Sequence, residues 1–457
     1  MSDETLQRRK QLLRQRMREQ RLLAADSEPT ITRRPDEPTP LSPGQQRMWF
    51  LQNRYPDDTT LNVCVAYRLD GELDPARLHS ALDTIVVRHE VLRSGYRVGA
   101  DGLPVQVPRT GVGVLWQEHD LSQRSAEGRE RGVEVLARRE FARPFDLEHD
   151  LPLRVTLVRL DAAAYVLILV AHHIAWDDDS WSVFFTELNA AYRGGELPAL
   201  RAQYADVATV GRPTDEADAA FWREQLKPLP DRIELPGPPG ARESSRVADK
   251  VLRPLDAQLV EGVAALGREL GATPFTVLLA AFEAVLSRYT AASDFLVAVP
   301  VTDRRGSHAP SLIGYFGNTV LIRARTEPTW TFADLVTATR DTCTAAFAHQ
   351  GLGVEQVVRE VSAGRASGGD GLAQLVQLSF GTRGSANGFD LPGVRARELD
   401  LSSQVAQEPL GMMVVLDEDR PRLELTYQVD QLGRELVTQL LDHYLEFVGE
   451  ALRDPRR

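Results

Sequence analysis

Two adjacent histidines are the residues of this chain whose type and placement are best suited to chemistry. His172 and His173 follow a run of apolar residues, and Asp177 and Asp178 come shortly after them. A neutral imidazole can take a proton from a reacting group, so a catalytic histidine oriented by its neighbours is one interpretation. A zinc site would need a third ligand, and the nine histidines of the chain include no HExxH spacing. A purely structural pair is the third interpretation, and we favour catalysis over both.

The elements that must position these histidines follow from the hydrophobic pattern. Residues 153–160 and 165–171 are rich in Val, Ile and Leu, which indicates two strands joined by a short turn. Residues 181–192 carry apolar side chains at helical spacing, and Gly194-Gly195 ends that helix. The histidines are therefore expected where a buried strand gives way to a helix.

The length of 457 residues exceeds what one hydrophobic core usually organises, so two domains are expected. Prolines cluster in residues 27–40 and again in 216–247, and we interpret both stretches as linkers. An N-terminal lobe then covers 41–215 and a C-terminal lobe covers 248–457. Both lobes mix helices with strands, so the predicted class is α+β, with two lobes facing a common cleft.

Residues 1–26 differ from the rest of the chain in charge. Apolar residues recur there at helical spacing among basic side chains, which indicates a basic amphipathic helix. Such a helix could dock on an acidic partner, or it could be a solvated leader. The basic residues are Arg8, Arg9, Lys10, Arg14, Arg16, Arg18 and Arg21.

The composition excludes several classes of function. The formal net charge of −12 argues against nucleic acid as a partner. No apolar run reaches the roughly 18 residues that would span a membrane, and residues 1–25 lack the apolar core of a signal peptide. We therefore expect a cytoplasmic protein. Cys64 and Cys343 form no metal-ligand or redox spacing, so we interpret both as small buried residues.

The segment from Ala171 to Asp178 resembles the HHxxxDG motif of condensation domains of nonribosomal peptide synthetases. Further segments are similar to other motifs of that family, in the same order along the chain: the opening motif, RHExLRT, YxDYA, IGxFVNT and a degraded HQDxPFE. They are Leu41–Leu51, Arg88–Ser94, Tyr204–Ala208, Ile313–Thr319 and His349–Glu355. Together these weak motifs make one strong signal.

The resemblance implies a role for each residue of the site. His173 aligns or deprotonates the attacking amine, while His172 supports the site from behind. Asp177 is an architectural residue that forms a buried pair with an arginine of the RHExLR segment, Arg93. Trp176 is expected to shape the wall of the substrate tunnel.

Two further positions carry open questions. Asp178 replaces the glycine of the family motif, and as one of three aspartates at a helix start it is expected to turn outward. Asn318 belongs to a loop from the other lobe, where it is either a turn residue or a direct substrate contact.

The resemblance also implies an architecture and a set of partners. It implies a V-shaped pair of chloramphenicol-acetyltransferase-like lobes around a tunnel. No cofactor is permanently bound, since the donor and acceptor groups arrive on the 4'-phosphopantetheine arms of two carrier proteins. Neighbouring synthetase modules are the expected partners, docked through residues 1–26.

Two other functions remain open. An epimerisation domain shares the histidine motif, but such domains normally follow their carrier protein. A degenerate condensation-like domain would instead recruit a tailoring oxidase, and Asp178 supports that interpretation while the presence of His173 opposes it. The cyclisation subtype has aspartates in place of both histidines and is excluded.

Overall fold

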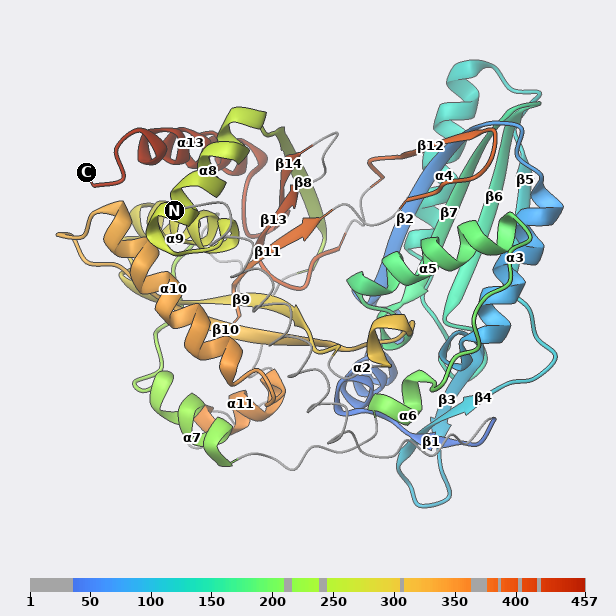
Figure 1. Cartoon of the computed structure of the whole chain (residues 1–457), viewed down its shortest axis with the longest axis horizontal. Coiled ribbons are helices and arrows are strands. Elements are labelled where there is room, and N and C mark those ends of the chain that lie inside the picture. The colour runs from blue at the N-terminus through green and yellow to red at the C-terminus, as the bar shows by residue number, and fades with distance from the viewer. Residues whose placement is uncertain are drawn as a thin grey trace, which may run out of the picture.

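The computed structural model describes residues 36–208, 216–237, 245–304, 308–362, 376–384, 388–401, 405–416 and 421–456. The expected basic helix 1–26 lies outside this part of the chain. Two lobes lie side by side, each built on an open sheet (Figure 1). The predicted mixture of helices and strands in two lobes is confirmed.

The N-terminal lobe contains a five-stranded sheet in the order β12-β2-β7-β6-β5, in which only the β5–β6 pair is parallel. The predicted strand pair is confirmed as β6 and β7. Every residue of β7 is buried, because helices α3, α4 and α5 contribute to the core around the sheet. A small sheet of order β1-β4-β3 adjoins it. The elements are β1 (Thr39–Pro40), α2 (Pro43–Arg54), β2 (Asn62–Gly71), α3 (Pro75–Arg88), η1 (Glu90–Arg93), β3 (Ser94–Val98), β4 (Pro104–Pro108), β5 (Leu115–Asp120), α4 (Ala126–Phe141), β6 (Leu153–Asp161), β7 (Ala164–His172), η2 (His173–Ala175), α5 (Asp178–Tyr192) and α6 (Tyr204–Ala208).

The C-terminal lobe contains a six-stranded sheet in the order β10-β9-β11-β13-β14-β8. Helices α8, α9, α10 and α13 lie on the side of this sheet that faces away from the other lobe (Figure 1). Apolar residues alternate along β14, so Leu423, Leu425 and Tyr427 enter the core beneath these helices. The elements are α7 (Glu216–Gln225), β8 (Ala248–Pro254), α8 (Ala257–Leu270), α9 (Pro274–Thr290), β9 (Asp294–Thr302), η3 (Ala309–Ser311), β10 (Gly317–Arg325), α10 (Phe332–Ala348), α11 (Val354–Ser362), β11 (Leu378–Gly384), β12 (Val394–Glu398), β13 (Leu410–Leu416), β14 (Arg422–Gln428) and α13 (Arg434–Arg453).

The lobes exchange segments, which the simple division at residues 216–247 did not anticipate. Strand β12 pairs with β2 and so adds an edge to the N-terminal sheet. Leu312, Ile313 and Phe316 also enter the N-terminal core. In the opposite direction, Trp222 of α7 lies in the C-terminal core, although the sequence pattern assigned it to a linker. These crossings join the lobes at several points along the chain.

Among the described residues, no single helix is long and apolar enough to cross a membrane. Helices α8 and α9 pass that test only as a pair, bent by 99° at the break between them.

A carboxyl group is buried between two helices of the C-terminal lobe. Glu283 of α9 accepts a hydrogen bond from Thr339 Oγ of α10 at 2.7 Å, while its other oxygen has no partner. Burial raises the pKa of Glu283 to about 8, and the Thr339 hydrogen bond opposes that shift. The group therefore stays protonated in the folded chain at neutral pH.

Replacing Glu283 by Gln should flatten the pH dependence of stability. The unfolded chain releases this proton near the ordinary pKa of 4.5 and the folded chain only near 8, so the stabilisation is complete below 4.5 and is lost as pH rises to about 8. Urea unfolding at about pH 5 and about pH 8 measures this difference. Glu261→Gln, at an exposed position of α8, is the matched control. Parallel pH profiles for wild type and Glu283→Gln would contradict the assignment.

Candidate active site

Strand β7 delivers the two histidines to the junction of the lobes. The backbone N–H of His172 donates to the Pro152 carbonyl at 2.9 Å, and that of His173 donates to the Leu61 carbonyl at 2.8 Å. The chain then makes one 3-10 turn, η2, before α5 begins. The predicted position of the pair between strand and helix is confirmed.

His172 is completely buried and its tautomer follows from its neighbours. Its Nδ1 accepts the Ile174 backbone N–H at 3.1 Å, so the proton is on Nε2, which faces Gln52 Oε1 at 3.2 Å. The Gln52 amide nitrogen donates to two carbonyls, those of Pro56 and Asp58, which turns its oxygen toward the histidine. Burial lowers the pKa of His172 to about 3, with smaller effects of His173 and Arg154. His172 therefore remains a neutral support.

His173 has the opposite tautomer and keeps part of its surface exposed. Its Nδ1 lies 2.6 Å from the Trp176 carbonyl oxygen, and a carbonyl only accepts, so Nδ1 carries the proton. In the neutral ring Nε2 then has a free lone pair. That nitrogen can accept a proton from a group bound beside it, which is the property expected of the catalytic histidine.

Asp177 fixes the start of α5 and is 5% exposed. As the N-cap residue it accepts from the Ser180 backbone N–H at 2.9 Å and from Ser180 Oγ at 2.7 Å. Its other oxygen accepts from the Phe316 backbone N–H at 3.1 Å. The carboxylate thus holds a helix of one lobe against a loop of the other.

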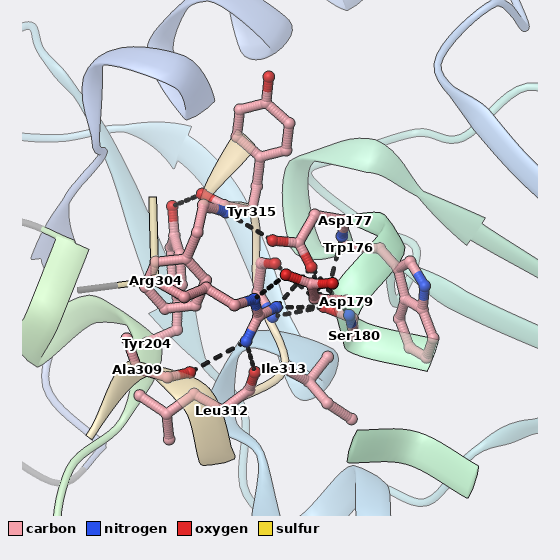
Figure 2. A network of polar contacts seen from close by, with 12 residues as sticks. Trp176, Asp177, Asp179, Ser180, Tyr204, Arg304, Ala309, Leu312, Ile313 and Tyr315 are labelled. Carbon is pink, nitrogen blue, oxygen red and sulfur yellow. Dashed lines mark hydrogen bonds and ion pairs between the residues drawn. The ribbon is translucent and has the colours of Figure 1, made fainter. Parts of the chain in front are cut away.

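The partner of Asp177 is Arg304, and the prediction of Arg93 is wrong. Arg304 follows β9 in the other half of the chain, and its guanidinium pairs with Asp177 while also donating to the carbonyls of Ala309 and Leu312 (Figure 2). Its charge lies 4.6 Å from the centre of the Phe316 ring.

Arg93 is engaged elsewhere. It donates to the carbonyls of Val87 and Arg109 and pairs with Asp36 at 2.8 Å. The motif identified an arginine near Asp177 in sequence order, but the pairing is decided by the packing of the two lobes.

The remaining site predictions have mixed outcomes. Trp176 is fully buried against Trp181 and Phe184, so its ring does not face an open tunnel. Asp178 is exposed in the first turn of α5, as expected of an outward-facing residue that complements the helix dipole.

Asn318 contributes to structure through its amide. Its Nδ2 donates to the carbonyls of Gln350 and Leu352, and its oxygen accepts the N–H groups of Thr319 and Val354. Of the two interpretations left open, this bonding favours the structural one, since it holds the 350–354 loop in place.

Sequence reasoning missed Arg304 and Tyr315. Tyr315 lies against His173, with ring centroids 5.4 Å apart and planes at 85°. Only its position inside the IGxFVNT-like segment could have suggested it. Among the described residues, cavities of about 600 and 740 Å³ lie elsewhere, and His173 lines neither of them. No group of three or more potential metal ligands occurs in the same part of the chain.

Comparison with known proteins decides the family. A family model, that of the condensation domain, matches residues 36–457. The chain belongs to the condensation-domain family. Condensation domains are acyltransferases that form peptide bonds in nonribosomal peptide synthetases, and the recognition made from the motifs is confirmed.

The similar proteins agree with this membership. One of the proteins that make up linear gramicidin synthase of Brevibacillus parabrevis is 31% identical over 440 residues, which cover 92% of this chain but 8% of that protein. This condensation domain therefore spans a small part of the relative's length.

Two solved structures show the same fold. The first condensation domain of the calcium-dependent antibiotic synthetase, in complex with a substrate analogue, has a TM-score of 0.76 at 23% identity, covering 92% of this chain and 98% of that one. The X-domain in complex with OxyB from teicoplanin biosynthesis has a TM-score of 0.79 at 25% identity, covering 94% and 97%.

Removing one member of the Asp177–Arg304 pair should destabilise the condensation domain. Arg304→Met leaves a buried carboxylate without its counter-charge, and the expected loss in free energy of unfolding is about 3–5 kcal/mol. Urea unfolding measures it. Arg246→Met provides the control, because the Arg246–Asp58 pair is more exposed and should contribute only about 0–1 kcal/mol. Equal unfolding midpoints for Arg304→Met and wild type would show that the pair is not needed.

Proposed function

We propose that this condensation domain joins two carrier-bound building blocks by attack of the acceptor amine on the donor thioester. Both groups arrive on phosphopantetheine arms and meet at His173 in a tunnel between the lobes. The observation that carries the proposal is the hydrogen bond from His173 Nδ1 to the Trp176 carbonyl, because it leaves Nε2 unprotonated.

The reaction balances with one transferred proton. The amine nitrogen forms a bond to the thioester carbon and becomes cationic, and His173 Nε2 takes the excess proton. The carbon–sulfur bond then breaks, the donor arm leaves as a thiolate, and the histidine returns the proton to that sulfur. Holding the two arms in register supplies a further part of the rate enhancement.

Replacing His173 by Ala should lower the rate of amide formation by about 100-fold or more, the usual contribution of a positioned general base. The assay follows the acceptor-bound product by mass spectrometry with both carrier proteins loaded. His79→Ala is the control, since His79 is partly exposed on α3, stacked on Trp116. Undiminished product from His173→Ala would remove the catalytic assignment.

A second candidate function is recruitment of a tailoring oxidase. It is favoured by Asp178 at the motif glycine position and by the likeness to the X-domain, which is known in complex with OxyB. If the wild-type chain forms no amide with any loaded pair yet binds an oxidase, this function replaces the first. Epimerisation is not favoured, since the similar proteins are synthetases and condensation domains.

We also propose that residues 1–26 recognise an acidic segment of an upstream synthetase in the cytoplasm. The segment concentrates basic residues in a chain whose net charge is −12. Attraction between such surfaces raises association rates and weakens as salt screens it over about 8–10 Å.

Deleting residues 1–26 should therefore raise the donor carrier concentration needed for half-maximal rate without changing the rate at saturation. The difference should shrink at high salt because screening removes the attraction. Titrations of loaded donor carrier at low and high ionic strength measure it, with full-length and shortened chains compared. Overlapping curves at low salt would support the solvated-leader interpretation instead.

A further inference from the structure

Tyr315 comes from the C-terminal half of the chain and lies directly against His173. The two rings meet at 85° with centroids 5.4 Å apart. The side chain projects away from the Asp177–Arg304 network, and its hydroxyl is at the far end of the ring (Figure 2). The ring therefore lies beside the catalytic histidine without being part of the buried ion pair.

Two glycines hold the Tyr315 ring from opposite edges. A Cβ at Gly44 would lie 2.6 Å from Cε1 of the ring, and a Cβ at Gly317 would lie 2.7 Å from Cε2. Any larger residue at either position must displace the ring. Gly44 begins α2 in the N-terminal lobe, so the two lobes together form this slot.

The backbone of the Tyr315 loop is fixed from the N-terminal lobe. Tyr204 Oη donates to the Tyr315 carbonyl at 2.8 Å, and the next residue, Phe316, donates its N–H to Asp177 at 3.1 Å. Asp177 also caps the helix that follows His173. The same carboxylate thus sets the positions of the histidine and of the tyrosine.

The hydroxyl of Tyr315 is left available. In the part of the chain that the structure describes it has no hydrogen-bond partner, and it is not among the buried unpaired polar atoms, so it reaches accessible space. Burial of the ring raises the pKa of the phenol to about 12, with smaller opposing effects of Arg47, which lowers it, and Glu355. The group is accordingly a protonated donor.

We propose that the Tyr315 hydroxyl donates a hydrogen bond to the donor thioester's carbonyl oxygen as negative charge develops on it. This inference rests on the proposed function. No proton is transferred, since the phenol stays protonated throughout. Tyr315 and His173 would then act on the two charges of the same step, the oxyanion and the ammonium.

Tyr315→Phe tests the hydroxyl while keeping the ring in its slot. Loss of the donor should lower kcat by about 10-fold or more with KM for the loaded donor little changed, because the bond strengthens only in the transition state. The full chain is assayed with both loaded carriers. Tyr289→Phe removes a phenol hydroxyl bonded to His443 on the outer side of the C-terminal lobe and should keep wild-type kcat.

Gly44→Ala tests the same inference without touching the phenol. The added methyl group displaces the ring, so kcat should fall to a similar extent, and Gly44→Ala combined with Tyr315→Phe should lose little more than either alone.

Wild-type kcat in Tyr315→Phe, or a change confined to KM, would overturn the inference. The same holds for two losses that multiply in the double variant. Failure of the wild-type chain to form amide would instead count against the proposed function, so the two failures are distinguishable.

Discussion

The site depends on one buried ion pair that joins distant parts of the chain. Asp177 and Arg304 are both nearly inaccessible, and such a pair is tolerated only when the remaining polar atoms are satisfied. Here the carboxylate accepts from Ser180 and from the Phe316 N–H, and the guanidinium donates to two carbonyls of the loop before β10. Because Asp177 also caps α5, the pair fixes the turn that carries His173 relative to the loop that carries Tyr315.

Within this frame the two histidines have different roles because their hydrogen bonds differ. His172 is enclosed, with its Nδ1 occupied by a backbone N–H, and burial keeps it neutral. His173 directs Nδ1 toward a carbonyl and leaves Nε2 for a substrate. Adjacent residues with the same side chain thus become a support and a proton acceptor through the atoms that surround each ring.

Local patterns predicted what local physics decides. The strand pair before His172 and the helix after Asp177 follow from apolar periodicity and capping, and the structure has both. The partner of Asp177 could not be predicted in this way, because a chain with 53 Lys and Arg residues offers many cations and only the packing of the lobes selects Arg304. The burial of Trp176 and the return of β12 to the first sheet depend on the same long-range packing.

The account of the site depends most directly on where the protons of the two histidines lie. Nitrogen-15 NMR of the histidine-labelled chain, with His172 and His173 assigned by single replacements, reads each tautomer from the chemical shifts and couplings of the ring nitrogens. The structure predicts a proton on Nδ1 of His173 and on Nε2 of His172 at neutral pH. A proton on Nε2 of His173 in the neutral ring would contradict the account, because the nitrogen assigned to accept the amine's proton would already be occupied.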